Sequence, residues 1–86
     1  MNGTARFGDN CIVQNGVNVS ESVVCGEGIY LGAGSKIMIG VHLADDIIVG
    51  ANAVVTKSFN EPNIVLAGIP AKKISDKGMK SGRIKV

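Results

Sequence analysis

Apolar residues recur at every sixth position along most of this 86-residue chain. A period of six fits neither the two-residue alternation of a β-strand nor the 3.6-residue turn of an α-helix. It is the pattern of a hexapeptide-repeat parallel β-helix, in which each repeat forms one side of a coil. The series has nine members and no interruption: Phe7, Val13, Val19, Cys25, Leu31, Ile37, Leu43, Val49 and Val55.

Two further rows of residues agree with this register. The position two before each member is apolar or small, as expected for a second inward-pointing row on a short strand: Ala5, Cys11, Val17, Val23, Ile29, Ser35, Val41, Ile47 and Ala53. The position three after each member carries residue types that suit tight turns: Asn10, Gly16, Ser22, Gly28, Gly34, Gly40, Asp46, Asn52 and Ser58. The agreement of three rows on one register predicts an all-β parallel β-helix.

If three hexads make one triangular coil of 18 residues, the nine hexads make about three coils. Residues 18 apart then stack at a spacing of about 4.8 Å. The outward side chains sort into three faces: Arg6, Val24 and His42; Ile12, Tyr30 and Ile48; Asn18, Lys36 and Val54. We call the second set the apolar stripe. We expect it to meet another subunit or the returning C-terminal segment, because a monomer would leave it in water.

The repeat predicts three segments along the chain. Residues 1–58 form the β-helix, residues 59–74 a capping turn with a short C-terminal extension, and residues 75–86 a basic tail. Within the extension, Ile64 to Ala67 and Ala71 to Ile74 are expected to be extended. Six of the nine Lys and Arg residues follow Pro70, and the last residues are expected to form a mobile tail or an added strand.

Composition limits the classes of protein to which this chain can belong. Apolar content of 45% and charged content of 19% fit one small globular domain. With no signal-peptide pattern and no long apolar run, a cytoplasmic protein without a membrane segment is expected. Aromatic content of 3% and a net charge of +2 argue against nucleic acid as a partner. Cys11 and Cys25 are read as reduced packing residues, and one histidine cannot supply a three-histidine metal site.

The corners of the coil also stack. Asp9, Glu27 and Asp45 form a column of like charge that is expected to face water. Asn15, Ala33 and Ala51 form a second column. Its small side chains leave the backbone approachable, so this corner is a candidate for binding an extended ligand.

Two motifs near the end of the repeat resemble those of a known family. Gly50-Ala51-Asn52-Ala53-Val54-Val55-Thr56-Lys57, followed by Gly68-Ile69-Pro70-Ala71-Lys72, is similar to the end of the left-handed β-helix domain of hexapeptide-repeat acyltransferases. Serine acetyltransferases are the nearest match, with maltose, galactoside and antibiotic acetyltransferases as relatives. Thr4 to Asn10 and Gly16 to Val19 resemble two earlier coils of that family. The similarity covers about residues 3–74, and it alone implies the left hand of the coil.

The resemblance implies an acetyl-CoA-dependent transferase that works as a homotrimer on a small-molecule substrate. In that family acetyl-CoA lies in a groove between neighbouring β-helices. The matching positions implied here are Ala33, Gly34, Ala51, Asn52, Lys57, Gly68 and Lys72. Small residues permit backbone hydrogen bonds to the pantetheine, and lysines pair with phosphate. The small residues also suit β-helix turns without any ligand, and the two lysines also suit a solvated surface.

The family's catalytic histidines have no counterpart in this sequence. In serine acetyltransferases one lies in a coil that would precede Met1. A second lies in a loop inserted after the coil that resembles Val17 to Ser20, whereas here the hexads continue without an insertion. The single histidine, His42, is therefore a weak catalytic candidate on an outward face. A general base also needs an orienting partner, and neither Asp45 nor Asp46 has a diagnostic spacing for that role.

Two functions follow from these observations. One is an O-acetyltransferase of the serine acetyltransferase type, in a truncated or degenerate form. The alternative is a non-catalytic trimeric β-helix that serves as a scaffold or interaction module. The coil edge near Phe7 and Val13 has no cap in the sequence. Either two trimers stack through this N-terminal coil, or sequence is missing upstream.

Overall fold

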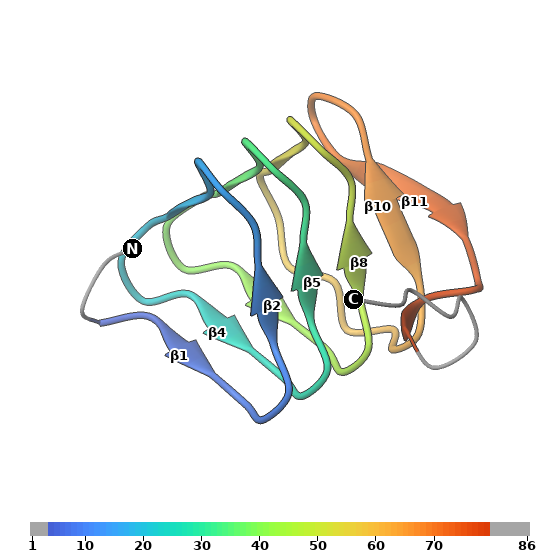
Figure 1. Cartoon of the computed structure of the whole chain (residues 1–86), viewed down its shortest axis with the longest axis horizontal. Coiled ribbons are helices and arrows are strands. Elements are labelled where there is room, and N and C mark those ends of the chain that lie inside the picture. Colours follow the sequence, from blue (N-terminus) through green and yellow to red (C-terminus); the bar gives the residue numbers. More distant parts are fainter. Residues whose placement is uncertain (1–3, 80–86) are drawn as a thin grey trace.

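Nine two-residue strands wind into three stacked, left-handed coils in the computed structural model, which describes residues 4–79 (Figure 1). The strands of the coils are β1 (Arg6–Phe7), β2 (Ile12–Val13), β3 (Asn18–Val19), β4 (Val24–Cys25), β5 (Tyr30–Leu31), β6 (Lys36–Ile37), β7 (His42–Leu43), β8 (Ile48–Val49) and β9 (Val54–Val55). Two further strands, β10 (Val65–Ala67) and β11 (Lys72–Ser75), follow the repeat. The predicted all-β parallel β-helix is confirmed.

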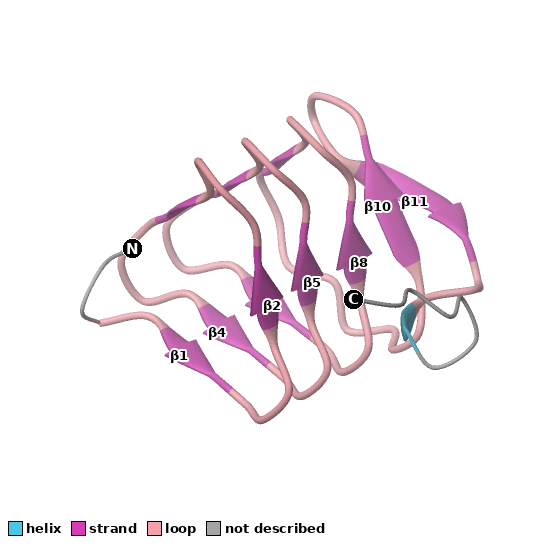
Figure 2. Ribbon diagram, viewed as in Figure 1, coloured by secondary structure: helices cyan, strands magenta, loops and turns pink. Residues whose placement is uncertain are grey.

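Three sheets form the three sides of the coil, and the strands of the coils pair in parallel within them (Figure 2). Sheet A has the order β1-β4-β7, sheet B the order β11-β10-β8-β5-β2, and sheet C the order β3-β6-β9. Within the coils every paired residue is 18 positions from its partner, as in the pairs Arg6–Val24 and Tyr30–Ile48. The three outward faces derived from the sequence are therefore confirmed residue by residue.

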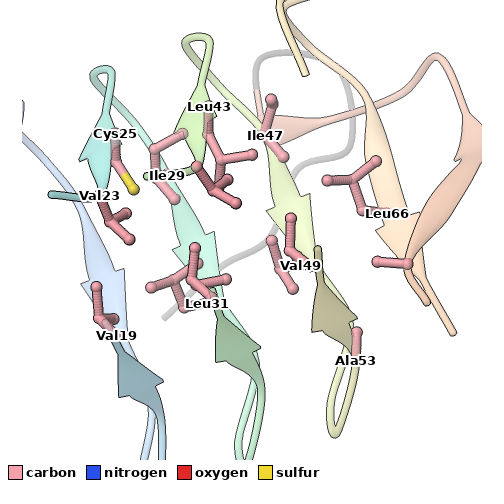
Figure 3. Packing of buried hydrophobic residues seen from close by; sticks show 14 of the residues in the cluster. Val19, Val23, Cys25, Ile29, Leu31, Leu43, Ile47, Val49, Ala53 and Leu66 are labelled. Carbon is pink, nitrogen blue, oxygen red and sulfur yellow. The ribbon is translucent and has the colours of Figure 1, made fainter. Parts of the chain in front are cut away.

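The inward rows of the three sheets meet along the axis of the coil and form the core (Figure 3). Leu31, Ile37, Val49 and Val55 are fully buried, and Ile29 from the second inward row lies among them. Short strands can be stable here because the coils stack, so both edges of each strand in the middle coil are hydrogen-bonded. Burial of this continuous apolar column is the main stabilising contribution.

The turns between strands use left-handed backbone conformations at the expected positions. Eight of the nine predicted turn positions have φ between 60° and 75°: Asn10, Gly16, Ser22, Gly28, Gly34, Gly40, Asp46 and Asn52. Glycine, Asn and Asp tolerate this region better than other residues, which explains their recurrence every six positions. The ninth position, Ser58, is not among them because the chain leaves the repeat there, and the Ser58 hydroxyl accepts a hydrogen bond from the His42 amide at 2.8 Å.

The residues after the repeat cap all three sheets at the C-terminal end. Phe59 bridges to Leu43 in sheet A. Strand β10 pairs in parallel with β8 in sheet B and is followed by the antiparallel β11, as the two predicted extended segments required. On sheet C, the Val54 amide donates to the Gly68 carbonyl at 3.1 Å and the Ala71 amide donates to the Val54 carbonyl at 2.8 Å. The last coil therefore has no open edge among the described residues.

The returning segment extends the apolar stripe. Val65 of β10 lies beside Ile48 in sheet B, so the segment joins the sheet edge to edge. Ile48 is 8% exposed, while Tyr30 and Ile12 are half-buried. Contact of the stripe with another subunit stays a prediction.

The described residues do not test the predicted basic tail or the predicted cytoplasmic location. Most of the predicted basic tail, including the possible strand at residues 83–86, lies outside the described residues. Within residues 4–79 no helix is long and apolar enough to cross a membrane, and the cytoplasmic location stays a prediction.

Candidate functional site

The small-residue column predicted at one corner lies where sheet B turns into sheet C. We call this the B–C corner and define it by Ala33, Gly34, Ala51 and Asn52. In the second and third coils the corner is a four-residue turn: the Ser35 amide donates to the Gly32 carbonyl at 3.1 Å, and the Ala53 amide donates to the Gly50 carbonyl at 3.3 Å. Gly34 and Asn52 occupy the third position of the turn with positive φ, which is the requirement of a type II turn.

The stacking of successive coils explains several of the small residues at this corner. A Cβ atom on Gly32 would lie 2.7 Å from the Val49 carbonyl oxygen and 2.7 Å from the Ala51 nitrogen. Both contacts are with backbone, so no side-chain movement could relieve them. The coils are also joined through the corner itself, because the Asn52 amide donates to the Ala33 carbonyl at 2.9 Å. Gly32 is therefore required by the fold.

Ala33 and Ala51 differ from these glycines because they are exposed and offer backbone donors. Both occupy the second position of their turn, where the N–H group is not used by the turn itself. No acceptor among residues 4–79 bonds to either amide. The two donors are 18 residues apart, so they lie about 4.8 Å apart along the axis of the coil. They form a short row of free amides on an uncharged edge.

The GIPAK motif continues the same edge beyond the third coil. Gly68 follows β10 with φ of 98°, and its neighbour Ile69 is 74% exposed. The peptide bond between Ile69 and Pro70 is cis. Lys72 lies opposite Ala67 in the β10–β11 pair, which brings this exposed lysine to the C-terminal end of the corner. Gly68 and Lys72 therefore lie on the same edge as the B–C corner.

The two neighbouring lysines of β11 have different surroundings. Lys73 binds Glu61 at 2.8 Å and Asp76 at 2.5 Å. Hydrogen bonds to Asp76 and then Glu61 raise the pKa of Lys73 above its ordinary value. Lys72 has no acidic partner among residues 4–79. It is the lysine of β11 whose charge is free to bind an anion.

Lys57 is the one proposed binding residue that the structure does not bring to this corner. It follows β9, at the next corner of the triangle, where sheet C turns into sheet A. Its ammonium nitrogen lies 5.6 Å from the centre of the Phe59 ring. This cation–π contact gives Lys57 a structural role within the cap.

The weak catalytic candidate His42 lies on sheet A, which is the side of the triangle opposite the B–C corner. Its backbone is used by the cap, because the Phe59 amide donates to the His42 carbonyl at 2.9 Å. No described residue hydrogen-bonds to its imidazole. Asp45 instead accepts a hydrogen bond from the Glu27 amide at 2.8 Å. Within one protomer, His42 has neither an orienting carboxylate nor access to the corner.

The chain also continues without an inserted loop between β3 and β4, where the family places a catalytic histidine. Sequence reasoning did not single out Ile69, although it is exposed beside Gly68. Its only signal in the sequence is an apolar residue inside a glycine–proline bend. Ser35 was predicted only as a small inward residue, and the structure buries its hydroxyl with no hydrogen-bond partner in the described part of the chain.

Comparison with known proteins agrees with this architecture. A family model described as the hexapeptide repeat of succinyl-transferase matches residues 6–21 and 22–57. The chain is 32% identical over 79 residues to a serine acetyltransferase of Mycobacterium tuberculosis, an alignment that covers 83% of this chain and 34% of that protein. It is 33% identical over 63 residues to the galactoside O-acetyltransferase of Escherichia coli K12, covering 73% and 30% of the two chains. The chain thus spans about a third of the length of these relatives.

A solved structure shares the fold. The N-acyltransferase AntD from Bacillus cereus, determined with dTDP-4-amino-4,6-dideoxyglucose and coenzyme A, superposes with a TM-score of 0.79 at 18% identity. The superposition covers 88% of this chain and 54% of AntD. The matching repeat model extends over more than half of the sequence and follows the observed coils. The chain therefore belongs to the hexapeptide-repeat acyltransferase family.

Proposed function

We propose that this chain is the acyl-CoA-binding β-helix of an acetyl-CoA-dependent O-acetyltransferase that acts on a small hydroxyl compound. Two relatives by sequence are named as a serine acetyltransferase and a galactoside O-acetyltransferase. Serine and galactosides are both small molecules that carry hydroxyl groups, so we propose a small hydroxyl compound as the acceptor.

The observation that carries the proposal is the row of free backbone amides at Ala33 and Ala51. Pantetheine is an extended chain with two amide groups, so its carbonyls can accept hydrogen bonds from a row of donors. Small, uncharged side chains at the B–C corner leave room for such a chain to lie against the backbone. Lys72, which has no acidic partner among the described residues, lies at the end of this edge and can bind a phosphate group as a point charge.

The proposed assembly is a homotrimer, in which a second β-helix would form the other wall of the groove. A single corner is convex and buries little of a ligand, whereas binding sites for small molecules are concave. In this arrangement Lys57 would not act at the same corner as Lys72 of its own protomer. His42 could act as a general base only if sheet A of one protomer faced the B–C corner of another.

Coenzyme A binding, measured by isothermal titration calorimetry, tests the site directly. Proline is well suited to the second position of a type II turn and lacks the N–H group. Ala51→Pro should therefore remove the donor and keep the turn, and weaken binding by about three- to tenfold, the value of one hydrogen bond. Ile39→Pro is the matched control, because Ile39 precedes Gly40 (φ of 75°) in the equivalent turn at another corner.

The proposal fails if the wild-type chain shows no binding at millimolar coenzyme A. It also fails if Ala51→Pro and Ile39→Pro bind with the wild-type affinity, since the free amide would then have no role.

The second candidate is a non-catalytic scaffold, and the uninterrupted coil between β3 and β4 favours it. The two functions are separated by assaying thiol release from acetyl-CoA with serine and with a galactoside as acceptors. Release that depends on the acceptor supports the enzyme. Binding of coenzyme A without transfer supports the scaffold.

A further inference from the structure

Strand β11 carries Lys72, but its own side chains bury little surface that could hold it in place. Among the described residues it is an edge strand of sheet B and pairs only with β10 (Figure 1). Lys72 and Lys73 are exposed, and Ile74 is 65% exposed. In β10, by contrast, Leu66 is fully buried in the core. Because apolar burial contributes little to β11, its position depends on backbone pairing with β10 and on polar contacts.

The pairing of β11 with β10 is interrupted in the middle of the strand. Lys73 lies opposite Leu66, but the next pair joins Val65 to Ser75. One step along β10 thus corresponds to two steps along β11, and Ile74 is the extra residue of a β-bulge. Regular pairing therefore ends at Lys73, and other contacts are needed to hold the strand beyond this residue.

Two acidic residues from different parts of the chain meet at Lys73. Its ammonium nitrogen lies 2.9 and 2.8 Å from the two carboxylate oxygens of Glu61 and 2.5 Å from a carboxylate oxygen of Asp76. Residues directly opposite each other share a face of the sheet, so Lys73 lies on the inner face with Leu66. Successive side chains alternate, which places Lys72 on the outer face. The ion pairs of Lys73 therefore tie β11 to the cap at the residue where regular pairing ends.

The segment after β11 has a second point of attachment at Gly78. The Gly78 amide donates to the Asn63 carbonyl at 3.0 Å, and the Met79 amide donates to the Asp46 carbonyl at 2.9 Å. A Cβ atom on Gly78 would overlap the Asp46 carbonyl oxygen and would lie 2.6 Å from the Asn63 carbonyl carbon. Both are backbone atoms, so no side-chain movement could relieve the contact. The segment is seated in a space that only glycine fits.

We infer that Lys73 is a positioning residue for Lys72 and thereby sets the preference of the B–C corner for coenzyme A over pantetheine, which lacks the phosphate groups. The inference rests on the proposed function, because it concerns the phosphate end of the same ligand. Lys73 and its two acidic partners hold β11 in the register that brings Lys72 to the end of the corner. Gly78 supports this placement from the segment that follows. Lys73 itself does not contact the ligand, since two carboxylates use its charge on the opposite face of the sheet.

The acids of this cluster distinguish positioning from a simple effect of charge. The phosphates of coenzyme A are anions, so removal of a nearby carboxylate should strengthen binding if only the summed charge mattered. If the acids act by holding Lys73, their removal should weaken binding instead. Glu61→Gln and Asp76→Asn should each weaken coenzyme A binding by about two- to fivefold, the value of one exposed ion pair.

Isothermal titration calorimetry of the full chain with coenzyme A and with pantetheine tests the inference. Lys72→Met should weaken coenzyme A binding by about tenfold or more, the value of a hydrogen bond to a charged group. Lys73→Met should weaken it by about two- to fivefold. The affinity for pantetheine should be unchanged in both variants. Lys77→Met is the matched control and should bind coenzyme A as the wild type does, because Lys77 is exposed and has no acidic partner among residues 4–79.

A double-mutant cycle shows whether Lys73 acts through Lys72. Lys72→Met/Lys73→Met should bind coenzyme A with the affinity of Lys72→Met alone, because Lys73 then has no lysine to position. Amide hydrogen exchange gives a structural measurement: the amides of β11 should exchange faster in Lys73→Met and Gly78→Ala than in Lys77→Met. Gly78→Ala should also lose affinity for coenzyme A and keep its affinity for pantetheine, a result that an unfolded protein could not give.

Additive effects of Lys72→Met and Lys73→Met would overturn the inference, since Lys73 would then bind the phosphate by itself. Tighter binding of coenzyme A by Glu61→Gln or Asp76→Asn would also overturn it, as would wild-type affinity in Lys73→Met. Each of these results leaves the proposed function intact, because the wild-type chain still binds both ligands. If the wild-type chain binds neither coenzyme A nor pantetheine, the proposed function fails and the inference fails with it.

Discussion

The contrast between Gly32 and Gly50 gives a stability prediction that isolates the packing of two coils. Both glycines follow a strand of sheet B and occupy the same position in successive coils. A Cβ atom on Gly32 would lie 2.7 Å from two backbone atoms of the third coil, whereas the nearest atom to a Cβ on Gly50 would be the Leu66 carbonyl oxygen at 3.4 Å. Alanine therefore fits at position 50 and collides at position 32.

The expected magnitude follows from this difference in distance. For Gly32→Ala to reach the spacing available at position 50, the third coil must retreat by about 0.7 Å, from 2.7 to 3.4 Å. This would lengthen the hydrogen bond from the Gly32 amide to the Val49 carbonyl, now 2.8 Å. Overpacking of this kind costs about 1–3 kcal/mol. The loss of unfolded-chain entropy, about 0.4–1 kcal/mol in favour of alanine, is common to both variants and cancels in the comparison.

Equilibrium unfolding in urea, followed by circular dichroism at equal protein concentration, measures the difference. Gly50→Ala should be as stable as the wild type or slightly more stable. Gly32→Ala should be less stable than Gly50→Ala by about 1–3 kcal/mol. In thermal unfolding each 1 kcal/mol corresponds to about 4–8 °C for a domain of this size. Two variants that agree within about 0.5 kcal/mol would refute the argument that close coil stacking excludes a side chain at position 32.

Two further predictions concern buried groups. Ser35→Ala should raise the free energy of unfolding by about 1 kcal/mol, because it removes a buried hydroxyl without a partner in the described residues; a loss of stability measured in urea would mean that the hydroxyl has a partner. Burial, with a smaller contribution from Cys11, raises the pKa of Cys25 from 9.0 to about 12. The folded state then holds the thiol proton more tightly than the unfolded state, so stability is lost as pH rises from about 9 to about 12. Cys25→Ala should show a smaller loss over that range when unfolding is measured at each pH, and an equal loss would contradict the assignment to Cys25.

Most of the fold could be predicted from the sequence because each hexad has the same arrangement of buried, exposed and turn residues. An inward residue, an outward residue and a turn residue occur in the same order nine times, and eight of the nine turn residues have positive φ. Their spacing fixes which side chains stack, so the pairing of Tyr30 with Ile48 could be read from positions 18 apart. The hand of the coil came from family resemblance, since the apolar period is the same for either hand.

The candidate site could be predicted only in part. Ala33 and Ala51 lie within the repeat, so the register placed them on one edge, and the structure agrees. Gly68 and Lys72 lie beyond the repeat, and they reach the same edge through contacts that the period does not describe. Val65 pairs with Ile48 at a separation of 17 residues, one fewer than within the coils. Lys57 lies at the corner between sheets C and A, not at the B–C corner, because it is still within the six-residue repeat, which fixes its position.

The sequence by itself determined the interior of the β-helix. In the middle coil each residue has the same kinds of neighbours above and below, so a local pattern is sufficient to define its environment. The ends were decided by the tertiary structure, because their neighbours do not come from the repeat. Closure of one end by β10 and β11 depends on where the chain returns after Ser58, while Val13, in the strand at the opposite edge of sheet B among the described residues, is 40% exposed. No six-residue pattern contains that long-range information.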